Sequence, residues 1–390
     1  MLQYSRFKLP VSPKKGGGGF HRVLVVLGVA FFGWVWWHTG SSLTPAPTAN
    51  PPPPSPRAPA TNPAATKPLS GPTNPVAKPV PLITRAGPGT VATKINAPNV
   101  GTVSAARRAQ NVFETQLALA RQGISSGSLD GVAGPQTRAA LRAFQLREHL
   151  PATGDLDGET KARIALPAPA YARYAITTND LARLQPLSPT WLGKSQQTAL
   201  DYETILELVA EQAHAHPSFI RHLNPGLDWT NILAGTTVQI PNAPFPAARV
   251  KAAFIKIQLQ NKTLQAFDAR TNLLAHFPCS IAKRVEKRPV GELHVAVIAP
   301  NPNYTFNPEV FPESAEARQL QRRLVLPPGP NNPVGTAWIG LDKPGYGIHG
   351  TPRPEEVGRT ESHGCFRLAN WNAELLLRLV SIGTPVEVEP

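Results

Sequence analysis

Residues 346–368 read YGIHGTPRPEEVGRTESHGCFRL and place two histidines close to one of the two cysteines of the chain. If residues 363–367 are extended, His363, Cys365 and Arg367 point to the same side, because side chains alternate along a strand. That side then presents an imidazole, a thiol and a guanidinium together. The pattern indicates a site built around a nucleophilic cysteine.

A cysteine nucleophile needs a base, a group that orients the base, and donors for the developing oxyanion. We expect His349 to act as the base and the carbonyl of Gly350 to orient it. Glycines at positions 350 and 364 allow the backbone to approach a substrate closely. Arg367 suits a carboxylate on the substrate. The residues therefore predict nucleophilic catalysis by Cys365.

Three other interpretations of these residues stay open on the pattern alone. Cys365 can be a small buried hydrophobic residue. The set of His349, His363 and Cys365 can bind zinc, although no fourth ligand stands at a familiar spacing. Cys279 and Cys365 can form a disulfide in an oxidising compartment.

The sequence around this stretch predicts a mainly β domain. From residue 250 the apolar residues alternate with polar ones, and Asn261-Lys262 turns the chain back, as in a β-hairpin. Further strands are expected at residues 293–298, 337–341 and 386–388. An amphipathic helix is expected at residues 371–380.

His-Gly-Thr at 349–351, Gly358 and Ser-His-Gly-Cys-Phe-Arg-Leu at 362–368 resemble the signature of the L,D-transpeptidase (YkuD-type) catalytic domain. The resemblance spans residues 250–388. Gly-Pro-Asn-Asn-Pro-Val-Gly at 329–335 is similar to the ErfK/YbiS-like branch of that family. Arg288, where the family usually has Thr, and Phe366, where Ile or Leu is commoner, depart from the pattern and affect the pocket lining more than the chemistry.

The resemblance implies a β-sandwich-like fold and assigns roles to the residues of the motif. Cys365 would be the nucleophile, activated by His349, and no metal or organic cofactor would be required. The carbonyl of Gly350 would orient the base. The oxyanion site would be formed by His363 and the backbone of Gly364 and Cys365, and the substrate would be bound by Arg367, Ser362 and Thr351.

By the same resemblance, the substrate is a peptidoglycan tetrapeptide stem that ends in a diamino acid and D-Ala. The acyl group would pass to an amine of another stem, of a lipoprotein or other wall-attached protein, or of a free D-amino acid. Two alternatives remain: hydrolysis of the same bonds, as in a carboxypeptidase or an amidase, and a non-catalytic protein that anchors to the wall.

Residues 104–170 predict a small three-helix unit. Phe113, Leu117 and Ala120 form one helical apolar stripe, and a Gly/Asp turn at Asp130-Gly131 recurs at residues 154–160, where Asp157-Gly158 is its counterpart. The stretches GSLDGVAGPQTRAALRAFQ and TGDLDGETKARI resemble the peptidoglycan-binding domain found beside many wall enzymes. Peptidoglycan is therefore the expected partner.

Residues 195–242 predict a second small unit, with two short helices and a closing strand near Val238 and Ile240. Asn-Pro-Gly-Leu at 224–227 and Gly-Thr-x-x-x-Ile-Pro at 235–241 resemble a LysM module, a βααβ fold that binds glycans containing N-acetylglucosamine. The alternative is a linker hairpin with incidental similarity.

The N-terminal part of the chain predicts a tether. Residues 1–21 are basic, residues 22–40 are apolar, and residues 41–100 form a proline-rich linker without a hydrophobic period. We expect a single-pass anchor in the inner (cytoplasmic) membrane, with the N-terminus inside and the catalytic domain in the periplasm. A cleaved signal peptide is the alternative, although the tryptophans at 34, 36 and 37 occupy the place of a cleavage site.

The net charge of +14 is concentrated at the N-terminus. Residues 1–113 hold twelve of the 39 Lys and Arg residues and no Asp or Glu, which leaves 27 basic and 25 acidic residues in the rest. The part of the chain with predicted domains is therefore almost neutral. We expect no nucleic-acid partner, because such proteins carry a basic patch on the folded domain.

Overall fold

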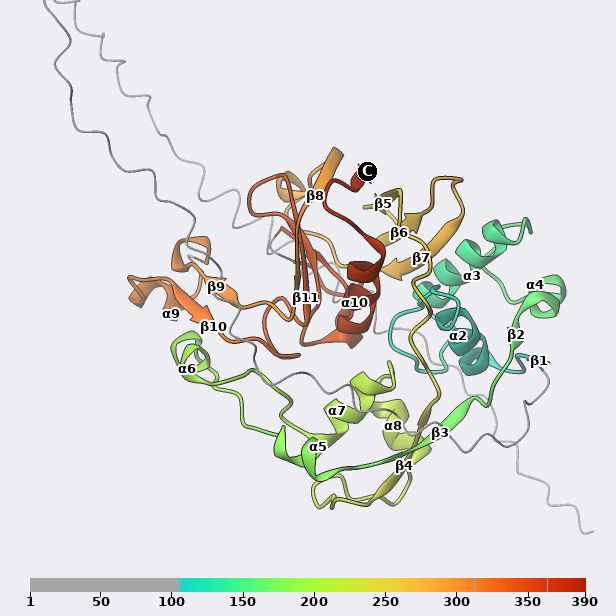
Figure 1. Cartoon of the computed structure of the whole chain (residues 1–390), viewed down its shortest axis with the longest axis horizontal. Coiled ribbons are helices and arrows are strands. Elements are labelled where there is room, and N and C mark those ends of the chain that lie inside the picture. The colour runs from blue at the N-terminus through green and yellow to red at the C-terminus, as the bar shows by residue number, and fades with distance from the viewer. Residues whose placement is uncertain (1–105, 312, 363) are drawn as a thin grey trace, which may run out of the picture. The chain divides into compact units, whose positions relative to one another are not determined.

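The computed structural model describes residues 106–311, 313–362 and 364–390 (Figure 1). All of these residues belong to one compact unit of the chain. The basic N-terminus predicted at 1–21, the apolar segment at 22–40 and the linker at 41–100 lie outside the described residues.

The predicted location in the inner membrane is contradicted. Across residues 106–311, 313–362 and 364–390, no helix combines the length and the apolar character that crossing a membrane requires. The helix α3 (Pro135–Arg147), for example, has 13 residues, whereas a span needs roughly 20.

The N-terminal part of the described chain, here called the helical module (residues 107–166), contains the three predicted helices. A two-residue antiparallel ladder between its first and last segments closes it. Its elements are β1 (Arg107–Arg108), α2 (Val112–Ala120), α3, α4 (Gly158–Arg163) and β2 (Ala165–Leu166).

A buried glutamine organises each copy of the internal repeat. Gln116 accepts a hydrogen bond from the Gly131 N–H (2.9 Å) and donates one to Thr137 Oγ1 (3.0 Å). The second copy has the same arrangement among Gln145, Gly154 and Thr160. Gly131 is therefore equivalent to Gly154, and not to Gly158 as the repeated Asp-Gly pair indicated.

The next segment, here called the middle module (residues 171–243), is a two-stranded antiparallel sheet with helices between its strands. The closing strand and the two helices of the predicted unit are present. The opening strand, however, lies before the predicted range, and two short helices follow that strand. The elements are β3 (Tyr171–Ala175), α5 (Thr178–Ala182), α6 (Trp191–Gln196), α7 (Ile205–Gln212), α8 (Pro217–Leu223) and β4 (Thr237–Pro241).

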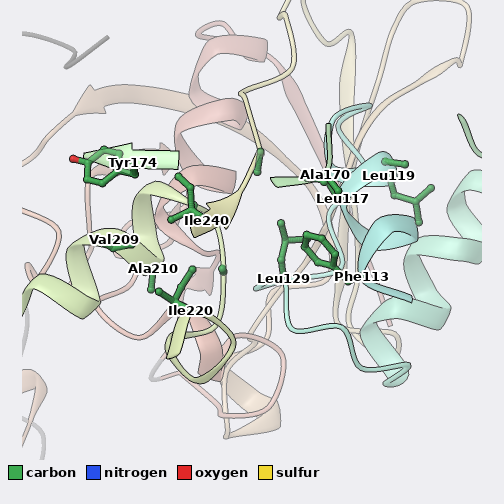
Figure 2. Packing of buried hydrophobic residues seen from close by; sticks show 14 of the residues in the cluster. Phe113, Leu117, Leu119, Leu129, Ala170, Tyr174, Val209, Ala210, Ile220 and Ile240 are labelled. Atoms are coloured by element: carbon green, nitrogen blue, oxygen red, sulfur yellow. The ribbon is translucent and has the colours of Figure 1, made fainter. Parts of the chain in front are cut away.

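The helical and middle modules share one hydrophobic core (Figure 2). Phe113 and Leu117 of α2 belong to the same buried cluster as Val209 of α7 and Ile240 of β4. The two units predicted as separate domains therefore pack against each other through a common set of buried apolar residues.

The C-terminal part, here called the sheet domain (residues 252–390), contains an eight-stranded mixed sheet in the order β13-β12-β11-β8-β14-β5-β6-β7. The predicted hairpin and the later predicted strands are all present. The strands are β5 (Phe254–Gln258), β6 (Thr263–Phe267), β7 (Leu273–Pro278), β8 (Gly291–Pro300), β11 (Ala337–Leu341), β12 (Gly347–His349), β13 (Phe366–Arg367) and β14 (Pro385–Glu389).

The long strand β8 explains why this domain is a curled sheet and not two separate sheets. Its first part pairs with β14 and its second part, from Val295, pairs with β11. A register shift at Gly340/Leu341 bends the sheet at this point, as β-bulges do. The predicted helix α10 (Asn370–Leu379) buries its apolar face in the core of the sheet domain.

A small excursion follows β8, here called the hairpin (residues 304–326). It contains β9 (Tyr304–Phe306), a short 3-10 turn at Pro308–Val310, α9 (Ala315–Gln319) and β10 (Leu324–Leu326). Two further 3-10 turns lie in the rest of the sheet domain, at Val285–Lys287 and Pro354–Glu356. Trp191 of α6 stacks on Phe306 with ring centroids 4.2 Å apart. The Glu316 carboxylate accepts hydrogen bonds from the N–H groups of Trp191 and Leu192 at the start of α6. The middle module therefore supports the hairpin.

The helical module is attached to the edge strand β7 of the sheet. The Ser125 N–H donates to the carbonyl of His276 (2.8 Å), and the His276 N–H donates to the carbonyl of Gly123 (2.9 Å). Asn372 of α10 donates to Ser125 Oγ (3.1 Å). These bonds satisfy the exposed backbone of the edge and fix the position of the module beside the sheet.

Candidate active site

Strand pairing brings the predicted site residues together. His349 ends β12 and lies opposite Arg367 of the parallel strand β13. Cys365 lies in a bend just before β13, so the extended strand expected over residues 363–367 is present only at its end. His363 lies outside the described residues.

The imidazole of His349 is 5% exposed and is held in one orientation. Its Nδ1 lies 2.6 Å from the carbonyl oxygen of Gly350. A carbonyl only accepts, so Nδ1 carries the proton and Nε2 keeps a free lone pair. The indole of Trp338 stacks on the ring, with centroids 5.6 Å apart.

Burial lowers the pKa of His349 to about 4, and the nearby charge of Arg367 adds to this, while the hydrogen bond to Gly350 opposes it. The ring is therefore neutral at pH 7, and its Nε2 is able to accept a proton.

Cys365 is a free, partly exposed thiol whose Sγ lies 3.5 Å from the carbonyl oxygen of Gly345. Burial raises the pKa of this thiol, and a backbone hydrogen bond from Gly347 and the charge of Arg367 work in the opposite direction. Cys279 is also free and fully buried in the core, so the alternative of a disulfide is not realised.

Arg367, two residues after Cys365, lines a cleft of about 290 Å³, here called the catalytic cleft. Burial lowers the pKa of Arg367, whereas the Cys365 thiol, Glu356 and Tyr304 raise it. Thr351 lines the same cleft. The other lining residues are Ser280, Pro333, Pro352, Arg353, Glu356, Val357 and Thr360.

Tyr304 is a site residue that the sequence analysis missed. It lies at the start of the hairpin, and burial together with the Cys365 thiol raises its pKa to about 12, while Arg367 lowers it. The hydroxyl therefore stays protonated and can donate a hydrogen bond near Cys365 and Arg367. The sequence contains only an Asn-Pro-Asn-Tyr run as a signal, and nothing in it shows that the hairpin folds back to Cys365.

Ser362 contacts the backbone of the cysteine loop. Its hydroxyl donates to the carbonyl of Cys365 (2.6 Å) and accepts from the Gly364 N–H (3.3 Å). Gly364, expected to help form the oxyanion site, thus directs its N–H to Ser362 in this structure. Ser362 holds the turn that presents the thiol.

Asn370 supports the loop that follows His349. Its Oδ1 accepts from the Thr351 N–H (3.0 Å), and its Nδ2 donates to Glu211 Oε1 of α7 (2.9 Å). A Cβ on Gly350 would lie only 2.1 Å from the same Oδ1, so this position requires glycine. The orienting carbonyl of Gly350 is therefore placed by contacts that extend to the middle module.

The zinc alternative concerns the side chains of His349, His363 and Cys365. Among the residues that the structure describes, no group of three or more His, Cys, Asp and Glu side chains could hold a metal ion. That interpretation requires His363, which is not among them.

Two known domain families match separate parts of the chain. Residues 252–388 match the model of the L,D-transpeptidase catalytic domain, YkuD. The sheet domain is an L,D-transpeptidase catalytic domain. Residues 108–164 match the model of a peptidoglycan-binding domain, so the helical module is confirmed as a domain of that kind.

Relatives of the L,D-transpeptidase domain agree with the match. The chain is 27% identical over 185 residues to the protein named L,D-transpeptidase YkuD of Bacillus licheniformis, covering 47% of this chain and 93% of that protein. It is 29% identical over 152 residues to the one named YqjB of Bacillus subtilis, covering 38% and 72%.

A search of solved structures returned L,D-transpeptidase 3 of Mycobacterium tuberculosis, at 18% identity and a TM-score of 0.29, covering 41% of this chain and 77% of that one. The class of function predicted from the sequence, an L,D-transpeptidase, is confirmed by the family match and the sequence relatives.

Proposed function

We propose that this L,D-transpeptidase domain cross-links peptidoglycan through a thioester on Cys365. The thiol attacks the carbonyl of the diamino acid in a tetrapeptide stem, and His349 Nε2 accepts the thiol proton. When the bond to D-Ala breaks, the protonated His349 returns that proton to the leaving amine. An acceptor amine then attacks the thioester, releases the thiol and completes the new amide bond.

The orientation of His349 is the observation that supports this proposal most strongly. The hydrogen bond to Gly350 fixes the tautomer, and burial keeps the ring neutral. The thiol and the imidazole can therefore both stay neutral until the substrate binds. The proton moves only as the new carbon–sulfur bond forms, as general base catalysis requires.

Arg367, Thr351 and Tyr304 provide the polar contacts for the donor. A guanidinium in a partly desolvated cleft recognises a stem carboxylate by charge-assisted hydrogen bonds. Tyr304 keeps its proton and can donate to a carbonyl of the stem. The oxyanion role of His363 and of the Gly364–Cys365 backbone remains part of this proposal.

The middle module would bind the glycan as a LysM-like unit that begins at β3. Its strands β3 and β4 pair, and α7 and α8 are the last two of the four helices between them, so a βααβ arrangement requires that α5 and α6 are an insertion after the first strand. Asn224 of the Asn-Pro-Gly-Leu element exchanges hydrogen bonds with the backbone of Gln239 in β4, at 2.7 and 2.8 Å. The motif asparagine therefore connects the end of α8 to the closing strand.

The finer assignments of the sequence analysis belong to the same proposal. We place the chain in the ErfK/YbiS-like branch on its Gly-Pro-Asn-Asn-Pro-Val-Gly element, where Asn331 donates to Glu207 of α7 and so connects this loop to the middle module. The acceptor would be the side-chain amine of another stem or a lysine of a wall-attached lipoprotein or other protein.

Purified peptidoglycan sacculi test the proposal. The chain is incubated with sacculi, and the muropeptides are then resolved by mass. We expect new cross-linked dimers joined through two diamino acids, with release of D-Ala, and none with the variant Cys365→Ala. Shortened, uncross-linked stems alone would replace transfer by hydrolysis, and no Cys365-dependent change would contradict the proposal.

A further inference from the structure

A second cleft, here called the junction cleft, lies where the helical module meets the sheet domain. Its volume is about 510 Å³. One wall is α3 of the helical module, with Gln136 and Arg142. The other is formed by β6, the turn that precedes it and β7, with Lys262, Gln265 and His276.

The chemistry of the junction cleft suits a carboxylate-bearing peptide. Arg142 and Lys262 supply two cations, and the described residues that line it include no Asp or Glu. Side-chain amides such as those of Gln136 and Gln265 both donate and accept, so they can pair with peptide groups. An anionic chain rich in amide bonds would satisfy both sets.

His276 adds a buried polar group to the cleft. Its side chain is 2% exposed, its Nδ1 lies 3.2 Å from Gln265 Nε2, and its Nε2 has no hydrogen-bond partner within the described chain. Burial, together with the charge of Arg142, lowers the pKa of His276 to about 4. The positive charge of the cleft therefore comes from Arg142 and Lys262, and not from His276.

The junction cleft adjoins the catalytic cleft through one loop. Gly358 lines the junction cleft, and its neighbour Val357 lines the catalytic cleft with Arg367. Gln136 of α3 donates to the carbonyl of Val357, and the Gly358 N–H donates to Ser280 Oγ at 2.8 Å. The two clefts therefore share a wall that both domains hold in place.

We propose that the junction cleft binds a second, carboxylate-bearing peptide stem of the same peptidoglycan strand whose neighbouring stem occupies the catalytic cleft. This inference rests on the proposed function and adds a subsite to it. The helical module would then select substrate jointly with the sheet domain, and a polymer would be recognised better than a single stem.

The test compares two donors in the full chain: soluble glycan strands that carry tetrapeptide stems, and a single disaccharide tetrapeptide. The double variant, with Arg142→Gln and Lys262→Gln, should raise KM for the strands about tenfold and leave kcat unchanged. A tenfold change corresponds to the loss of ~1.4 kcal/mol of charge-assisted contact. The single stem should be turned over as before. Lys161→Gln, an exposed change in the same module, is the matched control.

Direct binding separates this inference from the proposed function. In the Cys365→Ala background, strands should bind more weakly when Arg142 and Lys262 are replaced, when the stem carboxylates are amidated, and when salt is raised. This result would support the junction cleft even if neither donor were turned over. The lack of turnover would count against the proposed function alone. An unchanged KM and affinity for strands, or an equal loss for both donors, would overturn the inference.

Discussion

The Nδ1 atom of His349 lies 2.6 Å from the carbonyl oxygen of Gly350, the residue that follows it in the chain. This bond assigns the proton to Nδ1 and leaves Nε2 as the basic atom. Asn370 closes the space beside Gly350 and thereby fixes the direction of that carbonyl. The base is therefore positioned by a backbone carbonyl, and not by the carboxylate of an acidic side chain.

The reactivity of Cys365 should rise with pH without an early plateau. Burial raises the pKa of Cys365 and lowers that of His349 to about 4, so the pair is neutral and not a thiolate–imidazolium pair at pH 6. Labelling by iodoacetamide should increase through and above the ordinary thiol pKa of about 8.5. Cys365→Ala, which leaves only the buried Cys279, gives the background. A plateau below pH 7 would show a preformed ion pair.

Two glycines of the motif should respond differently to alanine. A Cβ on Gly350 would meet Asn370 Oδ1 at 2.1 Å, whereas a Cβ on Gly364 meets nothing within 4 Å. Gly350→Ala should lose about 1–3 kcal/mol of stability and most activity, because the strain displaces the orienting carbonyl. Gly364→Ala should stay within about 0.5 kcal/mol of the parent. Thermal unfolding of both variants decides this, and equal losses would be evidence against the described packing.

The buried carboxyl of Glu211 should make stability depend on pH. Burial, together with Glu374 and Glu207, raises its pKa from 4.5 to about 8, while the bond from Asn370 opposes the shift. The folded state holds this proton more tightly, so the stability it contributes is full below about pH 4.5 and is lost as pH rises through 8.

Glu211→Gln removes this titration and keeps an oxygen for Asn370. The variant should have the same unfolding temperature as the parent at pH 5 and one at least about 2 °C higher at pH 9. In a domain of this size, about 2 °C corresponds to a change of ~1 kcal/mol in stability. Differential scanning calorimetry at both pH values measures it, with the exposed Glu159→Gln as control. The same shift at pH 5 and pH 9 would refute the assignment.

The hydroxyl of Tyr304 should assist the reaction. Tyr304→Phe keeps the ring that lies 6.4 Å from Trp191 and removes only the donor beside Cys365 and Arg367. We expect kcat/KM for a tetrapeptide donor to fall about fivefold, as the loss of one hydrogen bond of ~1 kcal/mol implies. Unchanged kinetics would remove Tyr304 from the site, and Tyr171→Phe in β3 serves as the matched control.

Local periodicity explains what could be predicted. The alternation after residue 250 predicted the hairpin of β5 and β6, and the apolar stripe predicted α10, because each pattern repeats within a few residues. The spacing of His349 and Cys365 indicated one site, since parallel pairing of β12 and β13 brings the two segments together.

Contacts between distant segments could not be predicted in this way. Strand β3 pairs with β4 across four intervening helices, and the bond from Asn370 to Glu211 joins residues far apart in the chain. Neither relation leaves a periodic signal in the sequence. The same holds for Tyr304, whose place beside Cys365 depends on the support that Trp191 gives to the hairpin.

The mass of the acylated protein shows whether Cys365 carries the acyl group. The full chain is mixed with a disaccharide tetrapeptide donor without acceptor, quenched in acid and digested for peptide mapping. We predict an adduct equal to the donor minus D-Ala on the peptide that contains Cys365, labile to hydroxylamine as a thioester is, and absent from Cys365→Ala. An adduct on another residue, or D-Ala release by Cys365→Ala at the parent rate, would contradict the account.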